Sequence, residues 1–228
     1  MRLTKMTKLM LVPIIVALSW SALAQGWIKY ANEPERFIVN FPRDPDVLEI
    51  DYTAQSGVTM PARVYSVEDP ESRYSVTVVD YTMAEEVHAA HCRALSYECD
   101  GREARADILG SVAWEAWNMR RRDNGEITYD AFGALDGVPG HQLQIIHPDR
   151  SHSFIGIYLH ARRLYVLEGT VPGEDPPPGL FQQSLGILDA EGKRIRFEYD
   201  TDGHRTRVDV SYEWVGVEDP VTGEPQAP

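Results

Sequence analysis

Two blocks of strand-like sequence enclose a helical stretch, and this order most limits the folds open to the chain. Residues 37–81 hold four runs rich in β-branched and aromatic residues, separated by short turns. Residues 83–120 then show helical spacing of apolar side chains, and residues 126–171 hold four more strand-like runs. Because short connections join antiparallel neighbours, the pattern predicts an α+β domain, with an antiparallel β-sheet flanked by helices.

Turn signals delimit the expected elements. The expected strands are 37–41, 47–52, 58–67, 74–81, 126–135, 141–147, 153–160 and 163–171. The expected helices are 83–96, 102–120 and 180–188. In the second helix, the spacing places Ile108, Val112, Ala116 and Met119 in one apolar stripe, flanked by Leu109, Ala113 and Trp117.

The first 24 residues have the composition of a secretory signal peptide. Three basic residues precede an apolar run over residues 9–22, and Ala-Leu-Ala at 22–24 fits the small-residue cleavage rule. The alternative is an uncleaved membrane anchor, but the run is shorter than the roughly 20 apolar residues that cross a bilayer. We therefore expect a signal peptide at 1–24, a periplasmic or secreted location, and no stable membrane insertion after cleavage.

The remainder is predicted to form one domain at residues 25–200. A C-terminal extension at 201–228 follows, and its last part, from Gly216, is polar and rich in Pro, Gly and Glu. This composition is typical of disorder, so we expect the extension to be partly disordered.

The chain has a net charge of −13. Phosphate backbones are bound by Lys and Arg, so a chain this acidic is repelled by nucleic acid, which we exclude as a partner. The one dense basic cluster, Arg120 to Arg122, closes the second expected helix, where cations complement the negative end of the helix dipole. An anion site at these arginines is the alternative.

Cys92 and Cys99 are the only cysteines, and an exported chain meets an oxidising compartment in which cysteines usually pair. On an unbroken helix they would lie about 10 Å apart along the axis, which is farther than a disulfide allows. The dipeptide Asp100-Gly101 is a turn signal. Either the helix breaks before it and the two cysteines form a disulfide, or both stay reduced.

Glu85, His88 and His91 stand at helical spacings of three on the first expected helix, next to Cys92. This combination could ligate a transition metal, although it lacks the His-Glu-x-x-His order of a zinc-dependent enzyme. A solvated helix face is the alternative and the better interpretation. We expect no bound metal and no cofactor.

The remaining candidates for chemistry do not form a catalytic set. His147 and His152 flank a hairpin turn and could face one another across two strands, with Asp149 or His160 as a further ligand. Ser184 lacks the glycine-flanked elbow that exposes a nucleophile. We therefore expect that the protein is not an enzyme.

Trp114 and Trp117 lie three residues apart on the second expected helix. At about 100° per residue, both cannot point fully inward. Large aromatic side chains either fill a core or its rim or line a ligand groove. We interpret one of the two tryptophans as a contact residue for a partner.

Several stretches together resemble the PsbP-like fold. They are Arg36-Phe37-Ile38-Val39-Asn40-Phe41-Pro42, the strand at 74–81, and the closing pair of 163–167 with 180–185. This group includes the photosystem extrinsic subunit PsbP, the Ran-interacting Mog protein and exported bacterial proteins of unassigned role. The resemblance implies an α/β/α sandwich whose known members mostly bind other proteins, and it carries no catalytic residue over to this chain.

These observations lead to two expectations for function. The first is an exported non-enzymatic domain that acts as a protein-interaction or accessory factor of the cell envelope, with an envelope protein as its partner. The second is a periplasmic protein that binds a small ligand or a metal. Oligomeric state stays open at this point.

Overall fold

The structure is a computed structural model that describes residues 26–96 and 100–208. The predicted signal peptide, Cys99 and the predicted disordered tail from Gly216 lie outside the described residues. None of the described helices is both long enough and apolar enough to span a membrane.

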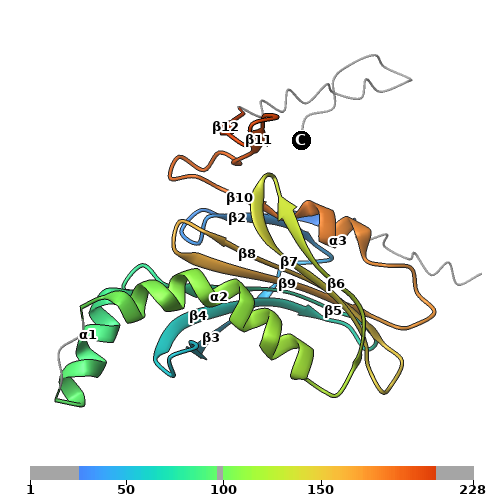
Figure 1. Ribbon diagram of the computed structural model, residues 1–228. Helices are drawn as coiled ribbons and strands as arrows, with labels where there is room; N and C mark the ends of the chain where they lie inside the picture. Colours follow the sequence, from blue (N-terminus) through green and yellow to red (C-terminus); the bar gives the residue numbers. More distant parts are fainter. Residues whose placement is uncertain (1–25, 97–99, 209–228) are drawn as a thin grey trace, which may run out of the picture.

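A seven-stranded antiparallel sheet forms the centre of the molecule (Figure 1). Its strand order is β3-β4-β5-β9-β8-β7-β6, so β3 and β6 are the edges. The strands are β3 Asp46–Thr53, β4 Thr59–Glu68, β5 Arg73–Asp80, β6 Glu126–Leu135, β7 Val138–Ile146, β8 His152–His160 and β9 Arg163–Val171. Two meanders, β3-β4-β5 and β6-β7-β8-β9, meet where β5 pairs with β9, and the predicted strands from residue 47 onward are thereby confirmed.

Two helices cover one face of this sheet. They are α1 Ala84–Ala94 and α2 Arg102–Arg121, and they connect β5 to the far edge strand β6. Alternate side chains of the strands point to this face, where they form a core with the helices. The fully buried members include Met60, Val79, Tyr81, Ile157 and Leu164.

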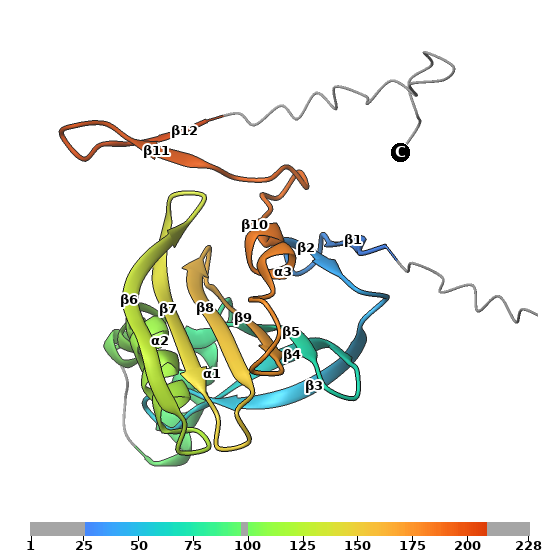
Figure 2. The same ribbon diagram turned by 90° about the vertical axis from the view of Figure 1, so that its right-hand side faces the viewer.

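A second, three-stranded sheet covers the opposite face (Figure 2). Its strands are β1 Ile28–Asn32, β2 Phe37–Phe41 and β10 Gly186–Ile187, and the short helix α3 Gly179–Ser184 packs beside it. The fully buried members of this second core include Phe37, Phe41, Tyr165, Phe181 and Leu185.

Two predictions are wrong on this face. The strand at 37–41 does not open the main meander, because it pairs with β1 and β10 in the separate sheet. The helix predicted at 180–188 ends at Ser184, because Gly186 and Ile187 pair with β2. The α+β class is confirmed, and the second outer layer of the predicted sandwich is α3 together with the small sheet.

A hairpin follows at the C-terminal end of the described chain. Its strands are β11 Phe197–Tyr199 and β12 Arg205–Arg207. The hairpin is held against the β6–β7 turn: the amide of Phe197 donates to the carbonyl of Asp136 at 2.8 Å, and the hydroxyl of Tyr199 donates to the carbonyl of Gly137 at 3.0 Å.

The turn between β8 and β9 is strained. Ala161 and Arg162 connect the two strands, and both have a left-handed backbone, with φ of 45° and 63°. A two-residue hairpin turn requires this conformation. Residues other than Gly and Asn adopt it at a cost of roughly 1–2 kcal/mol.

We predict that Ala161→Asn stabilises the protein by about 0.5–1 kcal/mol, because Asn tolerates this backbone region better than Ala. For a chain of this size the gain corresponds to a rise in Tm of about 1–4 °C. Thermal unfolding followed by circular dichroism measures it. Ala190→Asn is the control, because Ala190 is also exposed in a turn but has no positive φ; an equal gain in both variants would contradict the explanation.

Candidate functional site

The middle of helix α2 carries two acidic side chains on the side that faces the sheet. Asp107, Ser111 and Glu115 follow at intervals of four, so they share one face of the helix, and all three are buried. Neither carboxylate stands out in the sequence, although this spacing is a detectable signal. The orientation of α2 therefore places charge beneath the helix.

The apolar stripe predicted for α2 packs beside these polar residues. Ala116 and Met119 are buried, and Ile108 and Val112 are partly buried against the core. The inward face is thus half polar, which the apolar spacing alone did not indicate.

Asp107 joins three separate segments. Its Oδ2 accepts a hydrogen bond from the Ser56 hydroxyl at 2.6 Å, and its Oδ1 accepts one from the Ser56 amide at 3.0 Å. A further hydrogen bond of 2.9 Å links Oδ2 to Nε2 of His88 on α1. The carboxylate of Asp107 therefore ties the β3–β4 turn and both helices together, and its burial is matched by hydrogen bonds.

Glu115 lies farther along the same helix face. The Tyr52 hydroxyl donates to its Oε2 at 2.9 Å, and the Asn118 amide donates at 3.4 Å. Burial raises the pKa of the Glu115 carboxyl above its ordinary value, against the opposite influence of these two hydrogen bonds. Burial and the neighbouring Glu115 also raise the pKa of Tyr52.

With its charges turned inward, the middle of α2 presents an uncharged surface to solvent. Between Ala106 and Asn118, all described residues, the only charged side chains are the buried Asp107 and Glu115. We call the exposed side the α2 outer face. Its members are Ala106, Leu109, Gly110, Ala113, Trp114 and Trp117.

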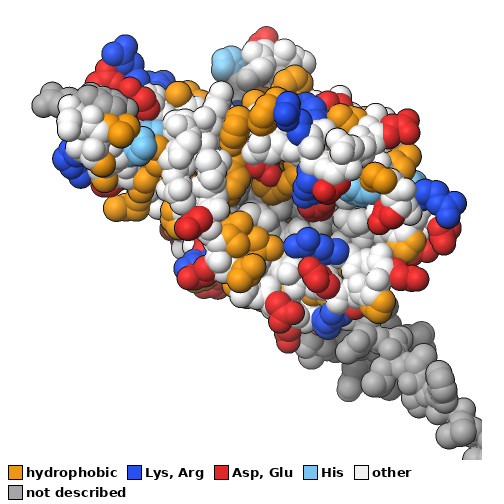
Figure 3. All heavy atoms as spheres, turned by 90° about the horizontal axis from the view of Figure 1, so that it is seen from below, with side chains coloured by type: hydrophobic (Ala, Val, Ile, Leu, Met, Phe, Trp, Pro, Cys, Tyr) orange, Lys and Arg blue, Asp and Glu red, His pale blue; other side chains and the backbone are white. Residues whose placement is uncertain are grey.

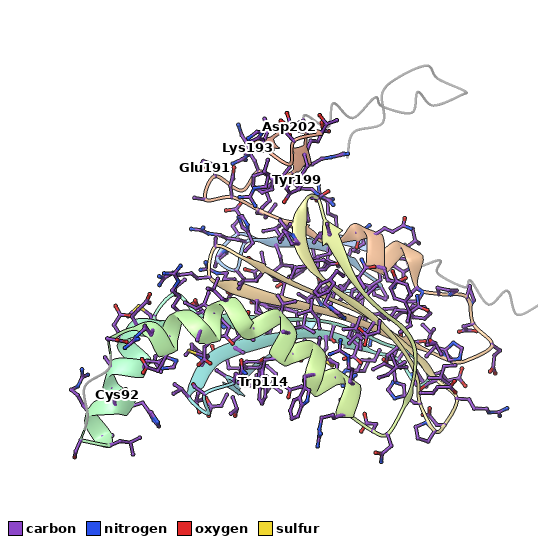
Figure 4. All side chains as sticks on the ribbon, viewed as in Figure 1. Cys92, Trp114, Glu191, Lys193, Tyr199 and Asp202 are labelled. Carbon is purple, nitrogen blue, oxygen red and sulfur yellow. The ribbon has the colours of Figure 1, made fainter. Side chains whose placement is uncertain are left out.

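The two tryptophans form the centre of the α2 outer face. Their rings stack with centroids 4.9 Å apart and planes inclined by 15°. Trp114 lies toward β3 (Figure 4), where its indole N–H donates to the carbonyl of Thr53 at 3.1 Å. Trp117 is 44% exposed, and the guanidinium of Arg121 lies 4.5 Å from its ring centroid. The pair is therefore preordered on a rigid helix.

The metal candidates of α1 do not converge. Glu85 forms an ion pair with Arg162, with contacts of 2.6 Å. His88 points inward and is hydrogen-bonded to Asp107. His91 is exposed on the helix surface. The three side chains therefore offer no common ligand geometry.

Only one of the two cysteines in the predicted disulfide lies within the described residues. Cys92 is buried on α1 and is engaged in a disulfide. Its predicted partner, Cys99, lies outside the described residues.

The other residues considered for chemistry have structural contacts. His147 is hydrogen-bonded to the fully buried hydroxyl of Ser153 at 2.7 Å. Within the described residues no hydrogen bond joins His147 to His152. The hydroxyl of Ser184 accepts a hydrogen bond from the backbone amide of Asn40 at 2.8 Å, and this contact joins α3 to β2.

Two of the three arginines in the basic cluster at the end of α2 form ion pairs, and the third, Arg121, lies over the Trp117 ring. Arg120 binds Asp130 of β6 through two hydrogen bonds of 2.6 and 2.8 Å, and His141 contacts the same carboxylate. These partners, Arg120 first, lower the pKa of Asp130 to about 2. Arg122 pairs with the partly buried Glu168 of β9. Arg120 and Arg122 therefore anchor the end of the helix to the sheet. Because carboxylates of the chain already occupy these two guanidinium groups, the structure does not support the alternative of an anion site.

One further group of side chains, which forms no recognisable motif in the sequence, has spacing suited to a metal. Asp200, Asp202 and His204 lie within 4.8 Å of one another in the β11–β12 turn. All three are exposed, and Oδ1 of Asp200 already accepts hydrogen bonds from the backbone amides of Asp202 and His204 at 3.0 and 2.8 Å. The closeness of these three side chains is therefore explained by the hydrogen bonds that form the turn.

Comparison with known proteins concerns the fold. No protein-family model matches the sequence, and no curated protein does. Among solved structures, the chain is similar to cyanobacterial PsbP (CyanoP) from Synechocystis sp. PCC 6803, with 12% identity, a TM-score of 0.42, and coverage of 76% of this chain and 99% of that one. It is also similar to a crystal structure from Bacteroides thetaiotaomicron VPI-5482, with 10% identity, a TM-score of 0.32, and coverage of 77% and 54%.

The first of these structures belongs by its name to the PsbP group that the sequence resembles. The likeness concerns the arrangement of strands and helices. At this identity and TM-score it transfers no residue roles and no activity, so the function is argued from the chain's own surface.

We predict that Glu115→Gln is more stable than the unmodified protein at pH 7, by on the order of 1 kcal/mol. Glutamine keeps an oxygen for the Tyr52 hydroxyl and removes the buried charge. Because the folded-state pKa of Glu115 is raised, its contribution to stability is present at low pH and is lost as pH rises through that pKa. The difference between the two proteins should therefore vanish near pH 4.

Urea unfolding at several pH values measures this difference. Glu103→Gln is the control, because Glu103 is exposed on the same helix, and its effect should be small at every pH. A variant at position 115 that is less stable than the unmodified protein at pH 7 would refute the burial argument.

Proposed function

We propose that the protein is an exported, non-enzymatic interaction domain of the cell envelope, and that it binds a protein partner through the α2 outer face. The observation that carries this proposal is the orientation of α2, in which Asp107 and Glu115 are buried while Leu109 and Trp117 remain 68% and 44% exposed. Exposed apolar surface of this kind marks contact sites in soluble proteins.

The composition of the α2 outer face supports a protein partner. Trp and Arg are enriched among the residues that contribute most binding energy at protein interfaces, and Trp117 and Arg121 are in contact here. The exposed residues Leu109 and Ala113 extend this uncharged surface beside the tryptophan pair. An apolar surface on the partner would cover it.

The internal contacts support a role without catalysis. His88 and His141, the two buried histidines, are each hydrogen-bonded to a carboxylate that also bonds other groups. Ser153 is fully buried behind its partners. These groups are occupied in holding elements together, which is the behaviour expected of a structural network.

Site-specific photo-crosslinking in the cell envelope of the source organism tests the proposal. A photoreactive amino acid replaces Ala113 at the centre of the α2 outer face, and the control replaces Ala90, an equally exposed alanine on α1. We expect one reproducible protein adduct from position 113 and none from position 90.

A second substitution tests whether the apolar contact itself is required. Leu109→Asp, combined with the photoreactive residue at position 113, should reduce the adduct at least tenfold, because a charge is placed in an apolar contact. Leu109 is 68% exposed, so the fold should tolerate the change, and the melting temperature checks this. Equal adducts from positions 113 and 90, or an adduct unaffected by Leu109→Asp, would overturn the proposal.

A further inference from the structure

A small hollow lies on the other face of the sheet and is lined by residues of β6 to β9 and helix α3. Figure 2 shows how these elements are arranged. Its volume is about 180 Å³. The polar and aromatic residues that line it are Tyr129, Gln142, Gln144, Tyr158, Gln182 and Gln183. None of its lining residues, all in the described part of the chain, carries a charge.

The absence of charge separates this hollow from the other three described. The second is lined by Glu35, Glu49 and Arg63, the third includes the pair Arg122–Glu168, and the fourth includes Glu85–Arg162. In each of these at least one ion pair joins two lining residues. Figure 3 shows that acidic and basic side chains are interspersed over the visible surface, with hydrophobic groups between them.

Two glycines shape the hollow. A Cβ at Gly156 would lie 2.9 Å from the ring of Tyr158, and a Cβ at Gly133 would lie 2.9 Å from Cδ of Gln142. The missing side chains let the ring and the amide lie flat on the sheet. There, Nε2 of Gln142 donates to the Tyr158 hydroxyl at 3.1 Å, and the hydroxyl proton remains to be donated to a ligand.

The other amides of the hollow are free to bind. Gln144, Gln182 and Gln183 have no hydrogen bond or ion pair from their side chains to the described residues. An amide both donates and accepts hydrogen bonds. Three such groups from β7 and α3, next to a tyrosine hydroxyl, form a set of mixed donors and acceptors without charge.

The walls supply apolar contact. Phe154 is 7% exposed at the base of the hollow, while the ring of Tyr129 is 43% exposed at its rim. A few polar groups on an apolar, aromatic lining are typical of small-molecule sites.

Size and charge limit the ligand. The hollow has room for about six water molecules, less than the roughly 300–1,000 Å³ of drug-sized sites, so it accepts one ring-sized unit. An ionised ligand would lose its hydration without gaining a counter-charge. An extended peptide adds to a free strand edge, whereas β7 and β8 are paired on both sides.

We propose that this hollow binds a neutral saccharide unit of hexose size, whose hydroxyl groups bond the free amides and whose apolar ring face packs on Tyr129. The site is separate from the α2 outer face, because the two lie on opposite faces of the main sheet. It goes beyond the protein contact proposed above, and neither proposal depends on the other.

Amide-resolved NMR titration of the isotope-labelled mature domain tests the proposal. The probes are the methyl glycosides of glucose, galactose, mannose and N-acetylglucosamine, with glucuronic acid as the charged counterpart. A ligand of this size should bind with a dissociation constant on the order of millimolar. We expect shifts in the side-chain amides of Gln144, Gln182 and Gln183 and in the backbone of Gly156 with at least one neutral sugar, and weaker shifts with glucuronic acid.

Substitutions then assign the effect to the hollow. Gln144→Ala and Gln183→Ala should each weaken binding about fivefold or more, and Gly156→Ala should abolish it by displacing the Tyr158 ring. Gln55→Ala is the control, since Gln55 is an exposed glutamine on the β3–β4 turn, on the side of α2. If Gly156→Ala fails to fold, the two glutamine variants decide the matter.

Three results would overturn the proposal. They are an absence of shifts with every neutral sugar at tens of millimolar, shifts that map away from the hollow, and equal weakening by Gln55→Ala. Stronger binding of glucuronic acid than of the neutral sugars would also refute it. None of these results bears on crosslinking at position 113.

Discussion

Two buried carboxylates determine which face of α2 is turned toward the sheet. Asp107 is bonded to the β3–β4 turn and to α1, and Glu115 is bonded to Tyr52 of β3. Burying a carboxylate without hydrogen-bond partners costs free energy of folding. If α2 turned its outer face toward the sheet, both carboxylates would move to solvent and lose these hydrogen bonds. The exposure of Trp117 is therefore a consequence of polar contacts beneath the helix.

The main sheet is covered on both faces, and this explains the composition of its central strands. β8 and β9 are buried on both sides, so they read as nearly continuous apolar runs, while the edge strands β3 and β6 carry many exposed residues. The two covering layers differ in kind. Helices with a partly polar underside lie on one face, and a small aromatic sheet with α3 lies on the other, where Phe37, Phe41 and Phe181 are fully buried.

The elements that sequence could predict are those whose signal is local. Alternation and turn dipeptides identify β3 to β9, and helical spacing identifies α1 and α2. The second sheet depends on β10, two residues that pair with β2 across nearly 150 positions, and no local pattern indicates such a pairing. In α2, apolar residues occur on both faces, so the spacing predicts a helix but not which face is buried; the contact of Asp107 with Ser56, 51 positions away, decides it. Trp117 was a candidate before the structure, whereas the glutamines of the hollow carry no recognisable motif.

The β11–β12 hairpin closes the end of the described chain that lies far from α2. It is held by Asp136 and Gly137 at the β6–β7 turn, and it lies on the opposite side of the molecule from α2 (Figure 1). A partner bound on the α2 outer face would therefore lie a full domain's thickness away from the hairpin, and the hairpin would stay accessible while that face is covered.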